Sequence, residues 1–65
     1  MTQLEDLRNF DKAQADYQKK LRVQAVEQAD YPERLQVIQD ELHRVKNLRH
    51  ETYYQIQQLE LEYLA

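Results

Sequence analysis

The sequence predicts an all-α protein, an antiparallel two-helix hairpin with coiled-coil-like packing, from three observations. Glycine is absent and proline occurs once in 65 residues, whereas the turns of sheet proteins need residues that tolerate positive φ. Good helix formers, chiefly Gln, Glu, Leu, Lys, Arg and Ala, dominate the chain. A heptad pattern with alternating steps of three and four fills the second half. Its members are Leu35, Ile38, Leu42, Val45, Arg49, Thr52, Ile56, Leu59 and Tyr63.

The first helix is expected over about residues 3–28 of a single domain spanning 1–65. Thr2 and Glu5 have the spacing of a capping box, in which the Thr2 hydroxyl accepts from the Glu5 backbone N–H. At 100° per residue the apolar side chains of this helix share one broad arc. They are Leu4, Leu7, Phe10, Tyr17, Leu21, Ala25 and Ala29, diluted by Gln3, Gln14 and Gln28.

A turn over 29–31 and a second helix over 32–63 are predicted from Asp30-Tyr31-Pro32-Glu33. Asp30 is expected to cap the helix, and proline is tolerated in a first helical turn. Proline also disfavours helical ψ at Tyr31, which ends the first helix before it. A connection this short is usual in helical hairpins. The alternative is a bent continuous helix in a dimer, because no glycine caps the first helix.

Arg49 and Thr52 interrupt the heptad pattern at its centre. Polar seam residues cost stability but can fix register or partner choice. We expect the gap to pair with a polar residue such as Gln14, which lies opposite it in a hairpin.

The last turns of the second helix are apolar on two sides, and a two-helix hairpin covers only one. A second row, offset from the heptad pattern, comprises His43, Asn47, His50, Tyr54, Gln57, Leu61 and Leu64. Contiguous exposed Leu and Tyr usually mark a contact surface. Tyr17, Tyr53 and Tyr63 are expected at the seam with their hydroxyls in water. The predicted partner-binding residues are Tyr54, Ile56, Leu59, Leu61, Tyr63 and Leu64.

No enzyme is predicted, and no catalytic residue, cofactor or metal. The chain has no cysteine and no glycine for a phosphate-binding loop. His43 and His50 would lie about 10.5 Å apart along one helix, too far for easy chelation. Carboxylates are plentiful, but a hairpin has no water-excluding pocket to shift their pKa values.

Association with another protein chain is predicted instead, either a second copy or a larger helical partner. A core this small supplies at most about 3–5 kcal/mol, and no disulfide supports it. The chain is therefore expected to act as an adaptor, co-chaperone or assembly factor. It has no apolar run long enough for a membrane span, and the expected location is cytoplasmic.

Nucleic acid is disfavoured as the main partner, because 9 basic and 12 acidic side chains leave a net charge of −3. The alternative function is a small regulator that binds nucleic acid, or an enzyme of nucleic acid, through basic helix faces. Those faces would consist of Lys19, Lys20 and Arg22, and of Arg44, Lys46 and Arg49.

The opening Met1-Thr2-Gln3-Leu4-Glu5, the chain length, the acidic balance and the two-helix pattern resemble the small type III secretion needle co-chaperones. The resemblance implies a helical hairpin that docks on a helical-repeat chaperone and helps to keep the needle subunit unpolymerised. The turn of this chain departs from that family because it lacks glycine. The resemblance carries over no binding residue.

Overall fold

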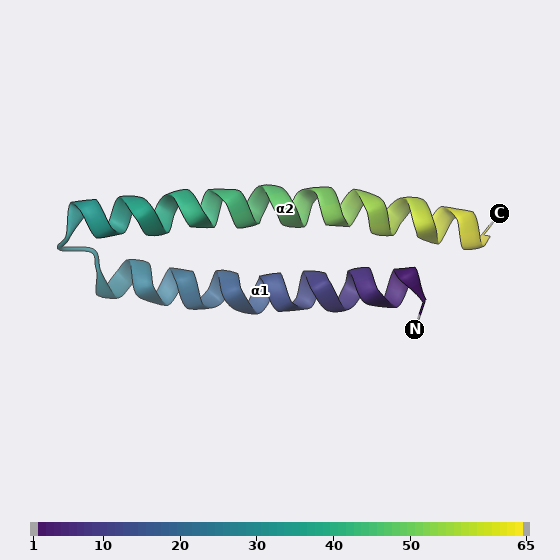
Figure 1. Ribbon diagram of the computed structural model, residues 1–65, viewed down its shortest axis with the longest axis horizontal. Coiled ribbons are helices and arrows are strands. Elements are labelled where there is room, and N and C mark those ends of the chain that lie inside the picture. Colours follow the sequence, from purple (N-terminus) through teal and green to yellow (C-terminus); the bar gives the residue numbers. More distant parts are fainter. Residues whose placement is uncertain (1, 65) are drawn as a thin grey trace.

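The computed structural model describes residues 2–64 and contains two α-helices, α1 (Gln3–Glu27) and α2 (Pro32–Leu64). The helices lie side by side and antiparallel in a body of 51 × 17 × 12 Å (Figure 1). Each helix differs from its predicted range by one residue. The predicted all-α hairpin is confirmed. The bent continuous helix is wrong, because the chain reverses direction between α1 and α2.

The start of α1 follows the predicted cap. The Thr2 Oγ1 atom accepts from the Glu5 backbone N–H at 3.2 Å, and the Thr2 carbonyl accepts from Asp6 N–H at 3.1 Å. Glu5 and Asp6 also place negative charge in the first turn, where the helix dipole favours it. Three local features therefore agree on where α1 begins.

The turn reverses the chain without glycine, and no residue among 2–64 has a positive φ. Tyr31 N–H donates to the Gln28 carbonyl at 2.9 Å, and the Tyr31 carbonyl accepts from Leu35 N–H at 2.9 Å. Tyr31 is thus the cap residue of α2 and Pro32 its first helical position. The predicted cap at Asp30 is wrong by one residue. Proline needs no N–H partner and its fixed φ suits the first helical position, so the cap falls immediately before it.

Arg34 holds the turn from the α2 side. Its guanidinium carbon lies 5.0 Å from the centroid of the Tyr31 ring, and its Nη1 atom donates to Gln28 Oε1 at 3.4 Å. One side chain thereby contacts both the cap of α2 and the end of α1. These two contacts of Arg34 connect the ends of the helices across a turn that has no glycine cap.

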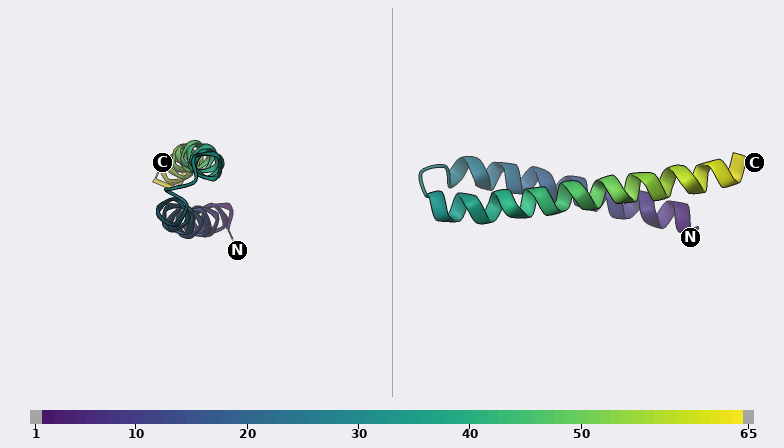
Figure 2. Two further views of the ribbon diagram at one scale, coloured as in Figure 1. Left: turned by 90° about the vertical axis from the view of Figure 1, so that its left-hand side faces the viewer. Right: turned by 90° about the horizontal axis from the view of Figure 1, so that it is seen from above.

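The seam between the helices contains buried and half-buried side chains that recur at steps of three and four on both helices. On α1 and its cap they are Leu4, Leu7, Asp11, Gln14, Gln18, Leu21, Ala25 and Gln28. On α2 they are Leu35, Ile38, Leu42, Val45, Arg49, Thr52, Ile56 and Leu59. Figure 2 shows the two helices crossing along their length, as expected for a heptad seam.

The expected seam of α1 is partly wrong, because Phe10, Tyr17 and Ala29 are exposed. The expected arc is that of a straight helix with 3.6 residues per turn. The contact line of two packed helices repeats every 3.5 residues, so the two diverge by about 20° per heptad. The 3.5 repeat brings Asp11 and Gln18 to the seam in place of Phe10 and Tyr17. Tyr53 and Tyr63 were also expected at the seam and are exposed.

The apolar core is thin. Leu21 and Val45 are the buried apolar side chains of residues 2–64, and the buried polar ones are Gln18 and Thr52. Neither helix contains a stretch apolar and long enough to cross a membrane, within the residues described. A single layer between two helices therefore carries the apolar burial of this hairpin.

Candidate protein-interaction surfaces

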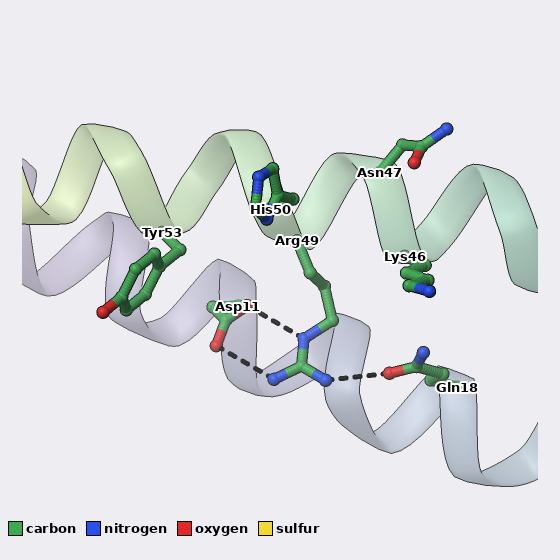
Figure 3. A pocket seen from close by; sticks show the side chains of 7 residues that line it. All are labelled: Asp11, Gln18, Lys46, Asn47, Arg49, His50 and Tyr53. Carbon is green, nitrogen blue, oxygen red and sulfur yellow. Dashed lines mark hydrogen bonds and ion pairs between the residues drawn. The ribbon is translucent and has the colours of Figure 1, made fainter.

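A polar cluster occupies the centre of the seam (Figure 3). Arg49 extends from α2 to α1 and donates from Nε to Asp11 Oδ1 at 3.0 Å and from Nη2 to Asp11 Oδ2 at 3.5 Å. Its Nη1 atom donates to Gln18 Oε1 at 2.8 Å. The expected pairing with Gln14 is wrong: the partners lie one turn to either side of it. The forked guanidinium donates two bonds to the Asp11 carboxylate, and its remaining terminal nitrogen donates to the Gln18 amide oxygen.

Thr52, the second interruption of the heptad pattern, is satisfied within its own helix. The Thr52 hydroxyl donates to the Leu48 carbonyl at 2.9 Å, and the residue is buried. Among residues 2–64, every buried side-chain nitrogen or oxygen has a hydrogen-bond partner. The centre of the seam is therefore polar, and its buried side-chain atoms are all paired. Polar seam residues of this kind can specify a register.

The predicted partner-binding residues divide into two groups in the structure. Ile56 and Leu59 are half-buried in the seam, so part of each side chain already packs within the hairpin and only the remainder is open to a partner. Tyr54, Leu61, Tyr63 and Leu64 are exposed. Tyr63 continues the heptad pattern, but α2 extends past the start of α1 (Figure 1), so the seam has ended at its level.

The outer row, defined as His50, Tyr54, Gln57, Leu61 and Leu64, follows the outer side of α2, and its first member, His50, also borders the groove between the helices. The exposed fraction is 66% for Leu61 and 84% for Leu64. The rings of His50 and Tyr54 contact edge to face, with centroids 4.9 Å apart. This contact orders the first turn of the row, while its last turns present apolar side chains to solvent.

Tyr53 borders the outer row and contacts two of its members. The Tyr53 and Tyr54 ring centroids lie 6.2 Å apart, and Gln57 Nε2 donates to the Tyr53 hydroxyl at 2.9 Å. Two neighbouring tyrosines are thereby held on the surface of α2. Rigid surface tyrosines suit interfaces, because they bury a large ring at low entropic cost.

One flank of the hairpin carries a hydrogen-bonded triad that joins the helices. The Tyr17 hydroxyl donates to Glu41 Oε2 at 3.1 Å, and Arg44 Nε donates to Glu41 Oε1. The pKa of Tyr17 is raised, mainly by partial loss of solvent around its hydroxyl and secondly by the hydrogen bond to Glu41. The Arg44 bond lowers the pKa of Glu41, and the Glu41 carboxylate raises the pKa of Arg44. The carboxylate of Glu41 is thus held in its charged form.

Arg8 and Glu60 form an ion pair between the helices near the open end of the hairpin, at 2.7 Å. Glu60 lies close to the carboxyl end of α2, where the helix dipole disfavours a negative charge. Arg8 supplies the positive charge that α2 lacks in its last turn. Both side chains are largely exposed, so the pair contributes little net stability.

A groove opens beside the polar cluster on the flank opposite the triad. Its lining consists of Asp11, Gln18, Lys46, Asn47, Arg49, His50 and Tyr53 (Figure 3). An adjacent hollow is lined by Gln18, Arg22, Gln39, Leu42, His43 and Lys46. The two share Gln18 and Lys46, so they lie next to each other along this flank of the hairpin.

Within residues 2–64, no three His, Cys, Asp or Glu side chains gather in a group able to hold a metal ion. No protein-family model, curated protein or solved structure matches the chain. The resemblance to needle co-chaperones stays a prediction. What the structure defines is a small helical hairpin with an exposed apolar row and a groove rich in basic side chains.

Proposed function

We propose that this chain is a non-enzymatic protein–protein interaction module that binds through the outer row of α2. The observation that carries the proposal is the contiguous exposure of Tyr54, Leu61 and Leu64. These side chains recur at steps of seven and three, which places them on one face of the helix. An exposed strip of large apolar side chains on one face is typical of a contact surface.

The expected mechanism is burial of that face against an apolar helical surface of the partner. Each Leu that becomes fully buried contributes about 1.5–3 kcal/mol. Anchors one or two turns apart are the pattern of helices that bind in grooves. Ile56 and Leu59 would then support the surface from the seam, and Tyr54, Leu61, Tyr63 and Leu64 would make the contacts. A co-chaperone or assembly factor works through such a surface.

The thin core supports the same proposal. With Leu21 and Val45 as the buried apolar side chains of the described chain, the hairpin has little internal apolar burial. Small domains of this kind usually gain stability by association. A partner that covers the outer row would stabilise the hairpin as it binds, since binding to the folded form shifts the folding equilibrium.

The test is a comparison of Leu61→Ser with Val37→Ser. Both side chains lie on α2 and have similar exposed fractions, 66% and 69%, but only Leu61 belongs to the outer row. Light scattering reports the mass of each purified variant, and thermal melting at several concentrations reports self-association. Affinity capture with each variant as bait, from the native host, reports a different partner.

We expect Leu61→Ser to lose the dimer, or to lose a captured protein that wild type and Val37→Ser retain. A folded monomer with concentration-independent melting, whose captured proteins do not change with Leu61→Ser, contradicts the proposal.

A further inference from the structure

Basic side chains from both helices converge on one flank of the hairpin. Arg22 of α1 lines the same hollow as His43 and Lys46 of α2. Lys46 in turn shares the adjacent groove with Arg49 and His50. Arg22 is far from these residues in sequence, so only the antiparallel packing brings it to them. We define the basic groove as Arg22, His43, Lys46, Arg49 and His50, with Gln18 and Tyr53.

Basic side chains also continue along α1 beyond the groove. Lys19 precedes Arg22 by three residues and Lys12 precedes Lys19 by seven, which places all three on one face of the helix. Lys12, Lys19 and Arg22 are exposed. The cationic surface is therefore longer than the depression itself.

Negative charge in the groove is already neutralised. Asp11 is the carboxylate among the lining side chains, and Arg49 binds both of its oxygens. Glu41 flanks the seam on the other side of α2 from Lys46, where it bonds Tyr17 and Arg44. Lys46, Arg22 and the two histidines consequently face a space without a free carboxylate from the lining residues. An overall acidic chain thus presents one basic flank.

The shape of the groove fits a helix. It lies between two rods and follows their axes, and from His43 to Tyr53 it extends about 15 Å at 1.5 Å per residue. That length matches roughly three turns of a third helix. A helix lying there would complete a three-helix bundle, and it would cover the exposed third of Arg49 and Asp11.

We propose that the basic groove binds an acidic amphipathic helix of a partner protein, whose carboxylates pair with Arg22 and Lys46 and accept a hydrogen bond from the His50 ring. Carboxylates one turn apart on that helix have the spacing of Lys46 and His50 on α2. The basic groove shares His50 with the outer row but does not include Leu61 or Leu64, so the inference goes beyond the proposed function and can fail without it.

A helix is favoured over nucleic acid by two observations. Tyr53 is the aromatic side chain that, with His50, lines the groove, whereas single strands need successive stacking platforms. The chain also carries a net charge of −3, which opposes a polyanion at long range but not a few local carboxylates.

The experiment measures binding by fluorescence anisotropy with three labelled probes. The first is a synthetic helical peptide of Glu, Ala and Leu, the second is the same peptide with every Glu replaced by Gln, and the third is a single-stranded oligothymidylate. The variants are Arg22→Glu and Lys46→Glu, with Lys20→Glu as a matched charge reversal on the far side of α1. Circular dichroism confirms that each variant keeps its helices.

We expect the Glu peptide to bind and the Gln peptide to bind at least about tenfold more weakly. Lys46→Glu and Arg22→Glu should each reduce binding of the Glu peptide about tenfold, whereas Lys20→Glu leaves it within about twofold. Rising sodium chloride should weaken binding. Leu61→Ser should not change it, which separates this inference from the proposed function.

The inference is overturned if neither peptide binds, if both bind equally, or if the groove variants match Lys20→Glu. Binding of the oligothymidylate in preference to the Glu peptide, lost in Lys46→Glu, would overturn it as well and assign the groove to nucleic acid.

Discussion

Arg49 and Asp11 are 38 residues apart in the sequence, yet they join α1 and α2 at the middle of the seam through contacts of 3.0 and 3.5 Å. The side chains are 36% and 30% exposed, so the pair is neither fully buried nor a surface pair. A slip of one heptad in either direction would bring Leu4 or Gln18 to the position of Asp11. The pair therefore distinguishes the native register from its nearest alternatives.

Replacing Asp11 with Asn should destabilise the hairpin by about 0.5–1 kcal/mol, because the amide keeps the shape but loses the charge that Arg49 binds. Urea unfolding followed by circular dichroism measures the change. Asp16→Asn, at an exposed position outside the seam, is the control and should leave the midpoint unaltered. Equal midpoints for the two variants would show that the ion pair contributes nothing to stability.

Replacing both Asp11 and Arg49 with Leu should raise stability by about 1 kcal/mol or more, because apolar packing at a seam often exceeds a partly buried ion pair. The same double variant should lose its unique register or oligomeric state. Urea unfolding and light scattering provide the two readouts. A double variant that is less stable than wild type would refute this account of the polar cluster.

Replacing Thr2 with Ala should cost about 1 kcal/mol, since the Glu5 backbone N–H loses its acceptor at the start of α1. Thr2→Ser keeps an acceptor oxygen and should stay within a few tenths of a kcal/mol of wild type. Thermal melting compares the three proteins. If Ser and Ala behave alike at this position, the cap does not stabilise the helix.

Acid should weaken the hairpin partly through Glu41. Its pKa is lowered in the folded chain, chiefly by the bond from Arg44. A lowered folded pKa contributes stability above the unfolded pKa, and that contribution is lost as pH falls through the folded value. Glu41→Gln should therefore show a smaller fall in melting temperature below the usual pKa range of glutamate. Parallel acid profiles for Glu41→Gln and wild type would rule out this linkage.

Much of the fold could be predicted because local signals agree with the global pattern. Thr2 and Pro32 mark the two helix starts, and the heptad pattern of α2 continues from Leu35 to Leu59 in the seam as expected. Residue type alone favours Asp30 as the cap of α2, because Asp is a usual capping residue. The position of proline decided the boundary instead.

The polar half of the seam was harder to predict. Asp11 and Gln18 continue the strict 3.5 repeat set by Leu4, Leu7 and Leu21, and that repeat was the available signal. Hydrophobicity alone favours Phe10 and Tyr17 over Asp11 and Gln18, but the seam of this hairpin is partly polar. The convergence of Arg22 with Lys46 depends on the register between helices, which no single-helix pattern contains.

The two helices differ in length, 33 residues against 25, and both ends of the described chain lie at the same end of the rod, far from the turn (Figure 1). A hairpin of this form can be grafted into a surface loop of a host protein as a projecting arm, with the turn at its tip. A fluorophore or affinity tag inserted at the turn would stand nearly the full 51 Å from the outermost leucines. The turn is therefore the position for labels, whereas a tag fused after Leu64 would sit against the surface under test.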